Sequence, residues 1–192
     1  MKKKLLVISL IAIVISVIAS GTLAFFTADD SAKNVFTSGG VSIEVEEWQV
    51  LDDGSKVPYP ETAPIEIMPG DVVSKFVTVK SAEEDVYVRA TLAYTVYDAN
   101  GDEMNLTADE IAAIISLDIN NAEWSVKDPA DGYYYYNGVV GDGDVTDELF
   151  TEVTFATSMD NRFQHCTVEI DVLAEAVQAK NNGTSALDCA WN

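Results

Sequence analysis

Residues 86–97, VYVRATLAYTVY, decide the fold that this sequence predicts. Side chains at the even positions, from Val86 to Val96, are apolar or aromatic, and those at the odd positions are mostly polar or amphipathic. A period of two is typical of an antiparallel strand with one buried face. Asn100 and Gly101 follow at once, and this pair predicts a type I′ hairpin turn.

The same alternation recurs along the chain and indicates an all-β fold. Residues 166–176 repeat it, and shorter strands are predicted at 41–45, at 73–79 from Val73, Lys75, Val77 and Val79, and at 153–155. Turn dipeptides and Gly-Asp repeats separate these runs at Asp53-Gly54, Pro69-Gly70, Asp131-Gly132 and residues 141–144. Many short strands with such turns predict an antiparallel two-sheet β-sandwich.

One short segment predicts a helix. Thr107 and Glu110 have the spacing of a capping box, in which each side chain bonds the backbone N–H of the other residue. Ile111, Ile114 and Ile115 then fall on one helical face. We expect about two turns of helix that serve as a lid or as a crossover between strands.

The N-terminus has the pattern of a secretory signal peptide. Three lysines at positions 2–4 precede an apolar run at residues 5–19, and the small residues Thr22 and Ala24 predict cleavage between Ala24 and Phe25. The alternative is an uncleaved membrane anchor, which needs about 20 apolar residues. Residues 5–26 reach that length only by including serines, a glycine and a threonine, so cleavage is favoured.

Three segments follow from this pattern. They are a signal peptide at 1–24, a flexible arm at 25–40 and a β-sandwich domain at 41–192. The arm is polar, lacks a clean alternation and carries three phenylalanines. After export the domain lies outside the membrane, so a membrane is a partner only before processing.

The chain is strongly acidic. Its 192 residues carry a formal charge of −21, and loss of the three N-terminal lysines changes this to −24. Such a surface excludes nucleic acid as a partner, because binding to phosphates requires the opposite sign. It favours solubility and can attract cations or basic partners.

The two cysteines, Cys166 and Cys189, both lie in the predicted exported part. An even number of cysteines outside the cell permits one disulfide. It would close a loop of about 23 residues and stabilise the fold by roughly 3 kcal/mol in the chain-entropy model. Two free thiols are the alternative.

Catalytic chemistry is poorly represented, and we expect neither an enzyme nor a cofactor. The single histidine, His165, cannot supply the usual ligands of a catalytic zinc, and the His-Glu-x-x-His motif is absent. His165 and Cys166 are expected as neighbours in a strand, where their side chains point to opposite faces and cannot form a dyad.

Calcium is a weaker possibility at one acidic turn. Oxygen-bearing side chains alternate there, at Asp98, Asn100, Asp102 and Glu103. The turn lacks the glycine spacing and the distal glutamate of an EF-hand loop. The alternative is an acidic hairpin turn without a metal.

Four consecutive tyrosines, Tyr133 to Tyr136, predict a strand with two rings facing inward and two outward. The outward pair would form a contact surface or cover the sheet. Trp48 and Trp124 are expected in the core or on a sheet face. Trp191 is expected to pack on the last strand near Cys189.

Several strings together carry a family resemblance. They are GTLAFFT at 21–27, N-x-FTSG at 34–39, MPGD at 68–71, YVR at 87–89, DGYYYYNG at 131–138 and EAVQA at 175–179. In this order the chain resembles the TasA/camelysin (CalY-like) proteins. These are secreted matrix proteins of Gram-positive bacteria whose signal peptide is removed by a SipW-type signal peptidase.

The resemblance implies a jelly-roll sandwich and a fibre-forming function. It implies that the arm of one copy adds as a strand to the sheet edge of the next, with Phe25, Phe26, Val35 and Phe36 as anchors. The partners would then be further copies in a head-to-tail homopolymer and the signal peptidase during export. Two alternatives remain. One is a monomeric surface adhesion or ligand-binding module, with or without calcium, and the other is a secreted metallo-endopeptidase of the camelysin kind, which the missing zinc ligands disfavour.

Overall fold

The computed structural model describes residues 41–60, 64–125, 128 and 130–191. The predicted signal peptide, its cleavage point between Ala24 and Phe25, and the arm at 25–40 lie outside the described residues. Within the described ranges the chain is all-β with one short α-helix, as the sequence predicts. No helix in these ranges has the length and apolar composition that crossing a bilayer requires.

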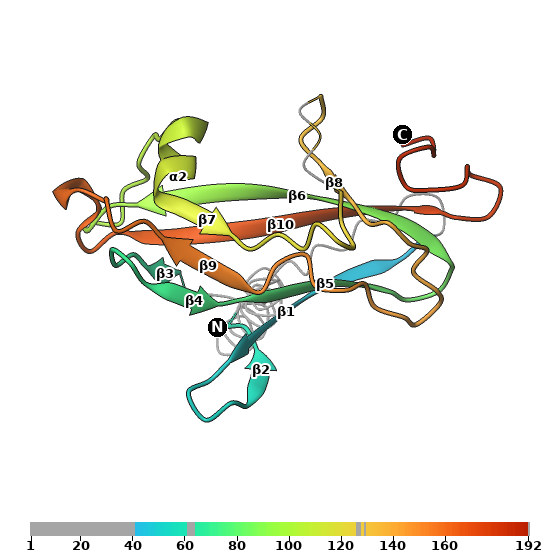
Figure 1. Cartoon of the computed structure of the whole chain (residues 1–192), viewed down its shortest axis with the longest axis horizontal. Helices are drawn as coiled ribbons and strands as arrows, with labels where there is room; N and C mark the ends of the chain where they lie inside the picture. Colours follow the sequence, from blue (N-terminus) through green and yellow to red (C-terminus); the bar gives the residue numbers. More distant parts are fainter. Residues whose placement is uncertain (1–40, 61–63, 126–127, 129, 192) are drawn as a thin grey trace, which may run out of the picture. The chain divides into compact units, whose positions relative to one another are not determined.

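Two twelve-residue strands form the centre of the first sheet (Figure 1). They are β6 (Val86–Tyr97) and β10 (Thr167–Gln178), which pair antiparallel along their whole length. Two short strands flank them, β3 (Ile65–Glu66) beside β10 and β8 (Tyr134–Tyr135) beside β6. Both long strands lie where the period of two predicts them.

The remaining strands form two three-stranded sheets. The first has the order β2 (Lys56–Pro58), β1 (Ile43–Val50), β5 (Phe76–Ser81). The second has the order β4 (Val72–Ser74), β9 (Glu152–Phe155), β7 (Ile115–Leu117).

The sequence predicts a single strand at 73–79, but the structure interrupts it at Lys75, between β4 and β5. The Lys75 N–H donates to the Thr151 carbonyl at 2.9 Å, and the Val77 N–H donates to the Phe150 carbonyl at 3.2 Å. At this interruption the chain leaves the β4–β9–β7 sheet and enters the β2–β1–β5 sheet.

One apolar core fills the sandwich-like arrangement. The inward residues of β6 and β10 are buried, as their alternation predicts, except for the half-buried Tyr94 and the exposed Gln178, and Trp124 is fully buried. The core takes further residues from both three-stranded sheets, including Ile43, Val77, Val79, Val153 and Phe155. At about 25 cal/mol per Å² of apolar surface, this burial is the main favourable contribution to folding.

Helix α2 (Ala108–Ile114) confirms the predicted capping box. The Thr107 hydroxyl accepts from the Glu110 N–H at 3.3 Å, and the Glu110 carboxylate accepts from the Thr107 N–H at 2.9 Å. Ile115 ends the helix in an extended conformation and begins β7. The helix is therefore the crossover between β6 of one sheet and β7 of another.

The turn after β6 differs from the prediction. A type I′ turn needs positive φ at both central residues. Gly101 has φ +85°, but Asn100 is not among the described residues with positive φ. The Gly101 N–H donates to the Asp98 carbonyl, and the Asp98 N–H donates to the Asp102 carbonyl. The hairpin is therefore a three-residue loop that ends in a left-handed glycine.

Candidate functional site

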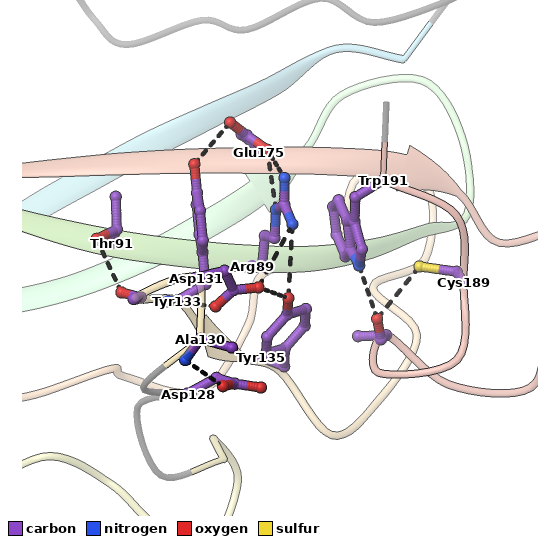
Figure 2. Close-up of polar contacts among 12 residues, drawn as sticks. Arg89, Thr91, Asp128, Ala130, Asp131, Tyr133, Tyr135, Glu175, Cys189 and Trp191 are labelled. Carbon is purple, nitrogen blue, oxygen red and sulfur yellow. Dashed lines mark hydrogen bonds and ion pairs between the residues drawn. The ribbon is translucent and has the colours of Figure 1, made fainter.

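The most concentrated polar cluster of the described residues lies on the outer face of the β10–β6–β8 sheet, around Arg89. Arg89 of β6 lies directly opposite Glu175 of β10. Its Nη2 and Nε atoms donate to one Glu175 oxygen at 2.6 and 2.9 Å. Its Nη1 atom lies 3.5 Å from the Tyr135 hydroxyl and 3.9 Å from the Asp131 carboxylate (Figure 2).

Aromatic rings complete the cluster. The Arg89 guanidinium carbon lies 4.1 Å from the ring centre of Tyr133 and 4.4 Å from that of Trp191. Figure 2 shows these two rings on either side of the guanidinium. The Tyr133 hydroxyl donates to Glu175 at 2.9 Å, and the Tyr135 hydroxyl donates to Asp131. We call this group the Arg89 cage, and its members are Arg89, Asp131, Tyr133, Tyr135, Glu175 and Trp191.

The pKa values of four members of the cage are shifted away from neutrality. Burial alone would lower the pKa of Arg89, but its bonds to Glu175 and Tyr135 outweigh burial and raise that pKa. Burial, followed by hydrogen bonds to carboxylates, raises the pKa of Tyr133 and of Tyr135. The bond from Tyr135 lowers the pKa of Asp131. No member whose pKa is shifted moves toward neutrality, so the cage has the character of a binding or packing site rather than of an acid–base centre.

Three of the strings that carry the family resemblance meet in this cage. Residues 87–89, 131–138 and 175–179 supply all of its members except Trp191. Sequence reasoning missed this convergence. One signal in the sequence could have found it: Arg89 and Glu175 both lie at odd-numbered, outward-facing positions of two long predicted strands.

The tyrosine run follows the predicted alternation. Tyr134 and Tyr136 pack against the main core, whereas Tyr133 and Tyr135 join a second apolar cluster on the outer face. That cluster also contains Trp191 and Cys189, which confirms that the C-terminal tryptophan packs near this cysteine.

A second charged group lies at the interruption between β4 and β5. The Lys75 side chain is 6% exposed, and its Nζ atom lies 2.9 Å from a Glu47 oxygen and 3.2 Å from the Ile170 carbonyl oxygen. It also lies 4.5 Å from the centre of the Tyr59 ring. The ammonium group therefore joins β1 and the chain after β2 to β10 of the other sheet.

One side of β10 is only partly covered by described strands. β3 pairs with Thr167 and Val168, and the Ile67 N–H donates to the Cys166 carbonyl. This pattern shows that even-numbered residues direct their backbone groups away from β6. Along Ala174–Gln178 no strand of the described residues is hydrogen-bonded on that side, although β1 is in contact with β10. The backbone groups of Ala174 and Ala176 therefore face a sheet edge that can template another strand.

The predicted disulfide between Cys166 and Cys189 is wrong for this structure, because both cysteines are free. Cys166 directly precedes β10, whereas Cys189 clusters with residues beside Glu175, nine positions further along. At about 3.3 Å per residue this separation is about 30 Å. A disulfide needs Cα atoms within about 7 Å of each other.

His165 is exposed, as expected, but it does not lie in a strand. It has φ +60° and belongs to the turn before β10, with its Nδ1 atom 3.9 Å from Glu66. Cys166 is buried, and its Sγ atom lies 3.3 Å from the Arg162 carbonyl oxygen. Burial raises the pKa of the Cys166 thiol, which disfavours the reactive thiolate.

The weak calcium candidates gather around one loop, where they serve the turn. The Asp98 carboxylate accepts from the backbone N–H groups of Asn100 and Asp102 at 2.8 and 3.0 Å. Glu103 forms an isolated bridge with Tyr97. Among the described residues there is no group of three or more His, Cys, Asp or Glu side chains arranged to hold a metal ion.

No protein-family model, curated protein or solved structure was found to match the chain.

Proposed function

We propose that the chain is a secreted structural subunit of an extracellular or biofilm-matrix fibre and that it assembles by donor-strand complementation. The observation that carries this proposal is the edge of β10 along Ala174–Gln178, beside a β3 that pairs with only two residues. The resemblance to TasA/camelysin proteins supports it, and with it a jelly-roll connectivity, a SipW-type signal peptide and localisation in the matrix or at the cell surface. The proposal assigns no catalytic role.

In this proposal the arm of one copy, residues 25–40, pairs with the β10 edge of the next copy. Backbone hydrogen bonds supply affinity, and the anchors Phe25, Phe26, Val35 and Phe36 enter apolar pockets. Each buried phenylalanine would contribute about 1.5–3 kcal/mol. The donor and acceptor surfaces differ, so the contact is head to tail and does not close on itself. A linear fibre is the result.

Charge opposes this assembly. Removal of three lysines changes the formal charge from −21 to −24, and β10 adds Glu169, Asp171 and Glu175 beside the proposed docking edge. Salt screens repulsion between exposed charges, and acid near the carboxylate pKa of about 4 removes it. We therefore expect fibres to form more readily at high salt or at mildly acidic pH.

The first experiment tests the arm. Intact-mass analysis of exported protein should show loss of residues 1–24. Electron microscopy and light scattering should then show filaments of the mature chain, and a chain that also lacks residues 25–36 should remain a folded monomer. Filaments that persist unchanged after the deletion would exclude the arm as donor. A mature chain that stays monomeric at high salt and low pH would favour the adhesion-module alternative.

The second experiment tests the edge with a matched pair of proline variants. Ala176→Pro removes an N–H that faces the edge, whereas Val177→Pro removes one that faces β6. We expect Ala176→Pro to keep its fold by circular dichroism and to lose filaments. Val177→Pro should lose stability instead. Normal filaments from a folded Ala176→Pro chain would show that this edge is not the acceptor.

A further inference from the structure

The C-terminal segment, residues 181–191, folds as a small unit of its own. The Asp188 carboxylate accepts from the hydroxyl groups of Thr184 and Ser185 at 3.2 and 2.9 Å. The Trp191 indole N–H donates to the Ala186 carbonyl at 2.9 Å, and the Cys189 thiol donates to the same carbonyl at 3.2 Å (Figure 2). In the described part of the chain, the hydrogen bonds of this segment end within it or at Ala179.

The segment contacts the sheet through apolar and cation–π contacts. The Trp191 ring lies over Arg89 and meets Tyr135 at an interplanar angle of 65°, with ring centres 5.8 Å apart. Ala186, 1% exposed, packs beside Tyr87 and Tyr135. The segment is therefore attached to the sheet through Trp191, Ala186 and Cys189.

The rest of the Arg89 cage does not depend on the segment. Glu175 holds two donors of Arg89, and Tyr133 covers one face of the guanidinium. Tyr135 is fixed by its bond to Asp131. The opposite face of the guanidinium is thus a preformed platform for one aromatic ring.

The chain reaches this platform through a sharp reversal directly after β10. Asn181 has φ +62° and Gly183 has φ +83°, so two left-handed residues lie within three positions. A side chain at Gly183 would lie 3.1 Å from the Asp188 carbonyl oxygen, so the reversal is tight. A short hinge before a terminal segment favours exchange of that segment between copies, because the exchanged state keeps the same contacts.

We propose that the C-terminal segment is an exchangeable docking element whose Trp191 fills the Arg89 cage either of its own chain or of a second copy. The occupant is this chain's own C-terminal segment, and the site is the outer face of β6, β8 and β10. This contact differs from strand addition at the β10 edge, so it stands or falls independently of the fibre proposal.

A peptide experiment tests the docking site. A fluorescein-labelled peptide of residues 180–192 is titrated onto purified full-length protein, with fluorescence anisotropy as the readout. A Trp191→Ala chain should bind it, and the wild-type chain should bind about tenfold more weakly because its own segment competes. A peptide with Trp191→Ala should bind at least about tenfold more weakly than the original. If a folded Arg89→Met/Glu175→Gln chain binds the original peptide as tightly as the Trp191→Ala chain does, the assignment of the site is overturned.

A mixing experiment tests exchange between copies. The Trp191→Ala chain has an intact cage and no anchor, whereas the Arg89→Met/Glu175→Gln chain has an anchor and no cage. We expect the mixture to show a two-chain species by light scattering that neither variant forms alone. Assembly through the arm would occur equally in the mixture and in the separate samples. Only the difference in light scattering between the mixture and the separate variants therefore reports on exchange. A mixture equal to the sum of its components would refute exchange.

Discussion

Replacing Lys75 by methionine should destabilise the fold substantially. Methionine keeps most of the apolar stem but removes the ammonium that bonds the Glu47 carboxylate and the Ile170 carbonyl and lies over the Tyr59 ring. Breaking a buried ion pair by removing one partner costs about 3–5 kcal/mol. Glu47 is 28% exposed, so water can hydrate part of the remaining carboxylate. We therefore expect a loss of about 2–3 kcal/mol in the free energy of unfolding.

A double-mutant cycle makes this prediction specific. Glu47→Gln alone should cost about 3 kcal/mol, because it leaves an ammonium buried beside a neutral amide. The Lys75→Met/Glu47→Gln chain should recover to within about 1 kcal/mol of the wild type, since neither charge then remains unpaired. Urea denaturation at neutral pH measures all four chains. Single variants within about 0.5 kcal/mol of the wild type, or additive effects, would refute the reasoning.

Two further predictions concern a carboxylate and the thiols. Asp118 accepts three hydrogen bonds, two from Thr151 and one from the Glu152 N–H; burial would raise its pKa, but these bonds outweigh burial and lower it. Its contribution is therefore present above the unfolded pKa of about 3.9 and is lost as pH falls through the lower folded value. Asp118→Asn should cost about 1 kcal/mol at pH 7 and progressively less as pH falls below the unfolded pKa of about 3.9, and a constant cost across urea melts at several pH values would contradict this. In protein that was never reduced, Cys189 should react with Ellman's reagent, whereas Cys166 should react only after unfolding. If neither cysteine reacts in the denatured protein, the two are joined in a disulfide and the prediction of free thiols is wrong.

Strand positions and facing were readable from the sequence because alternation is a local signal. The pattern placed residues 86–97 and 166–176 in strands, and it grouped Lys75 with Val73, Val77 and Val79 in a further strand. It could not identify Glu47 or Ile170 as partners of Lys75, because these contacts depend on how two sheets pack. The Arg89–Glu175 pair was missed for the same reason, since it requires the register between strands 86 positions apart.

The errors have local causes. Pairing the two cysteines by count ignored the length of the intervening strand, which separates their positions by far more than a disulfide can span. His165 was placed in a strand because it adjoins an alternating run, but its φ of +60° places it in the turn before that run, which begins as a strand at Thr167. The dipeptide Asn100-Gly101 correctly marked a turn, while Asp98, by bonding two backbone N–H groups, favours a three-residue loop.

The pairing of β6 with β10 has a consequence for the order of folding. The last described strand, β10, pairs with β6 along its whole length, whereas β3 pairs with it only at Thr167 and Val168. β6 is made long before β10, so the backbone groups on that side of β6 lack their strand partner until β10 has been made. Contacts of such long range slow folding, because the loop must close before they can form. We therefore expect the domain to fold in one late, cooperative step, with few stable forms among its C-terminally shortened fragments.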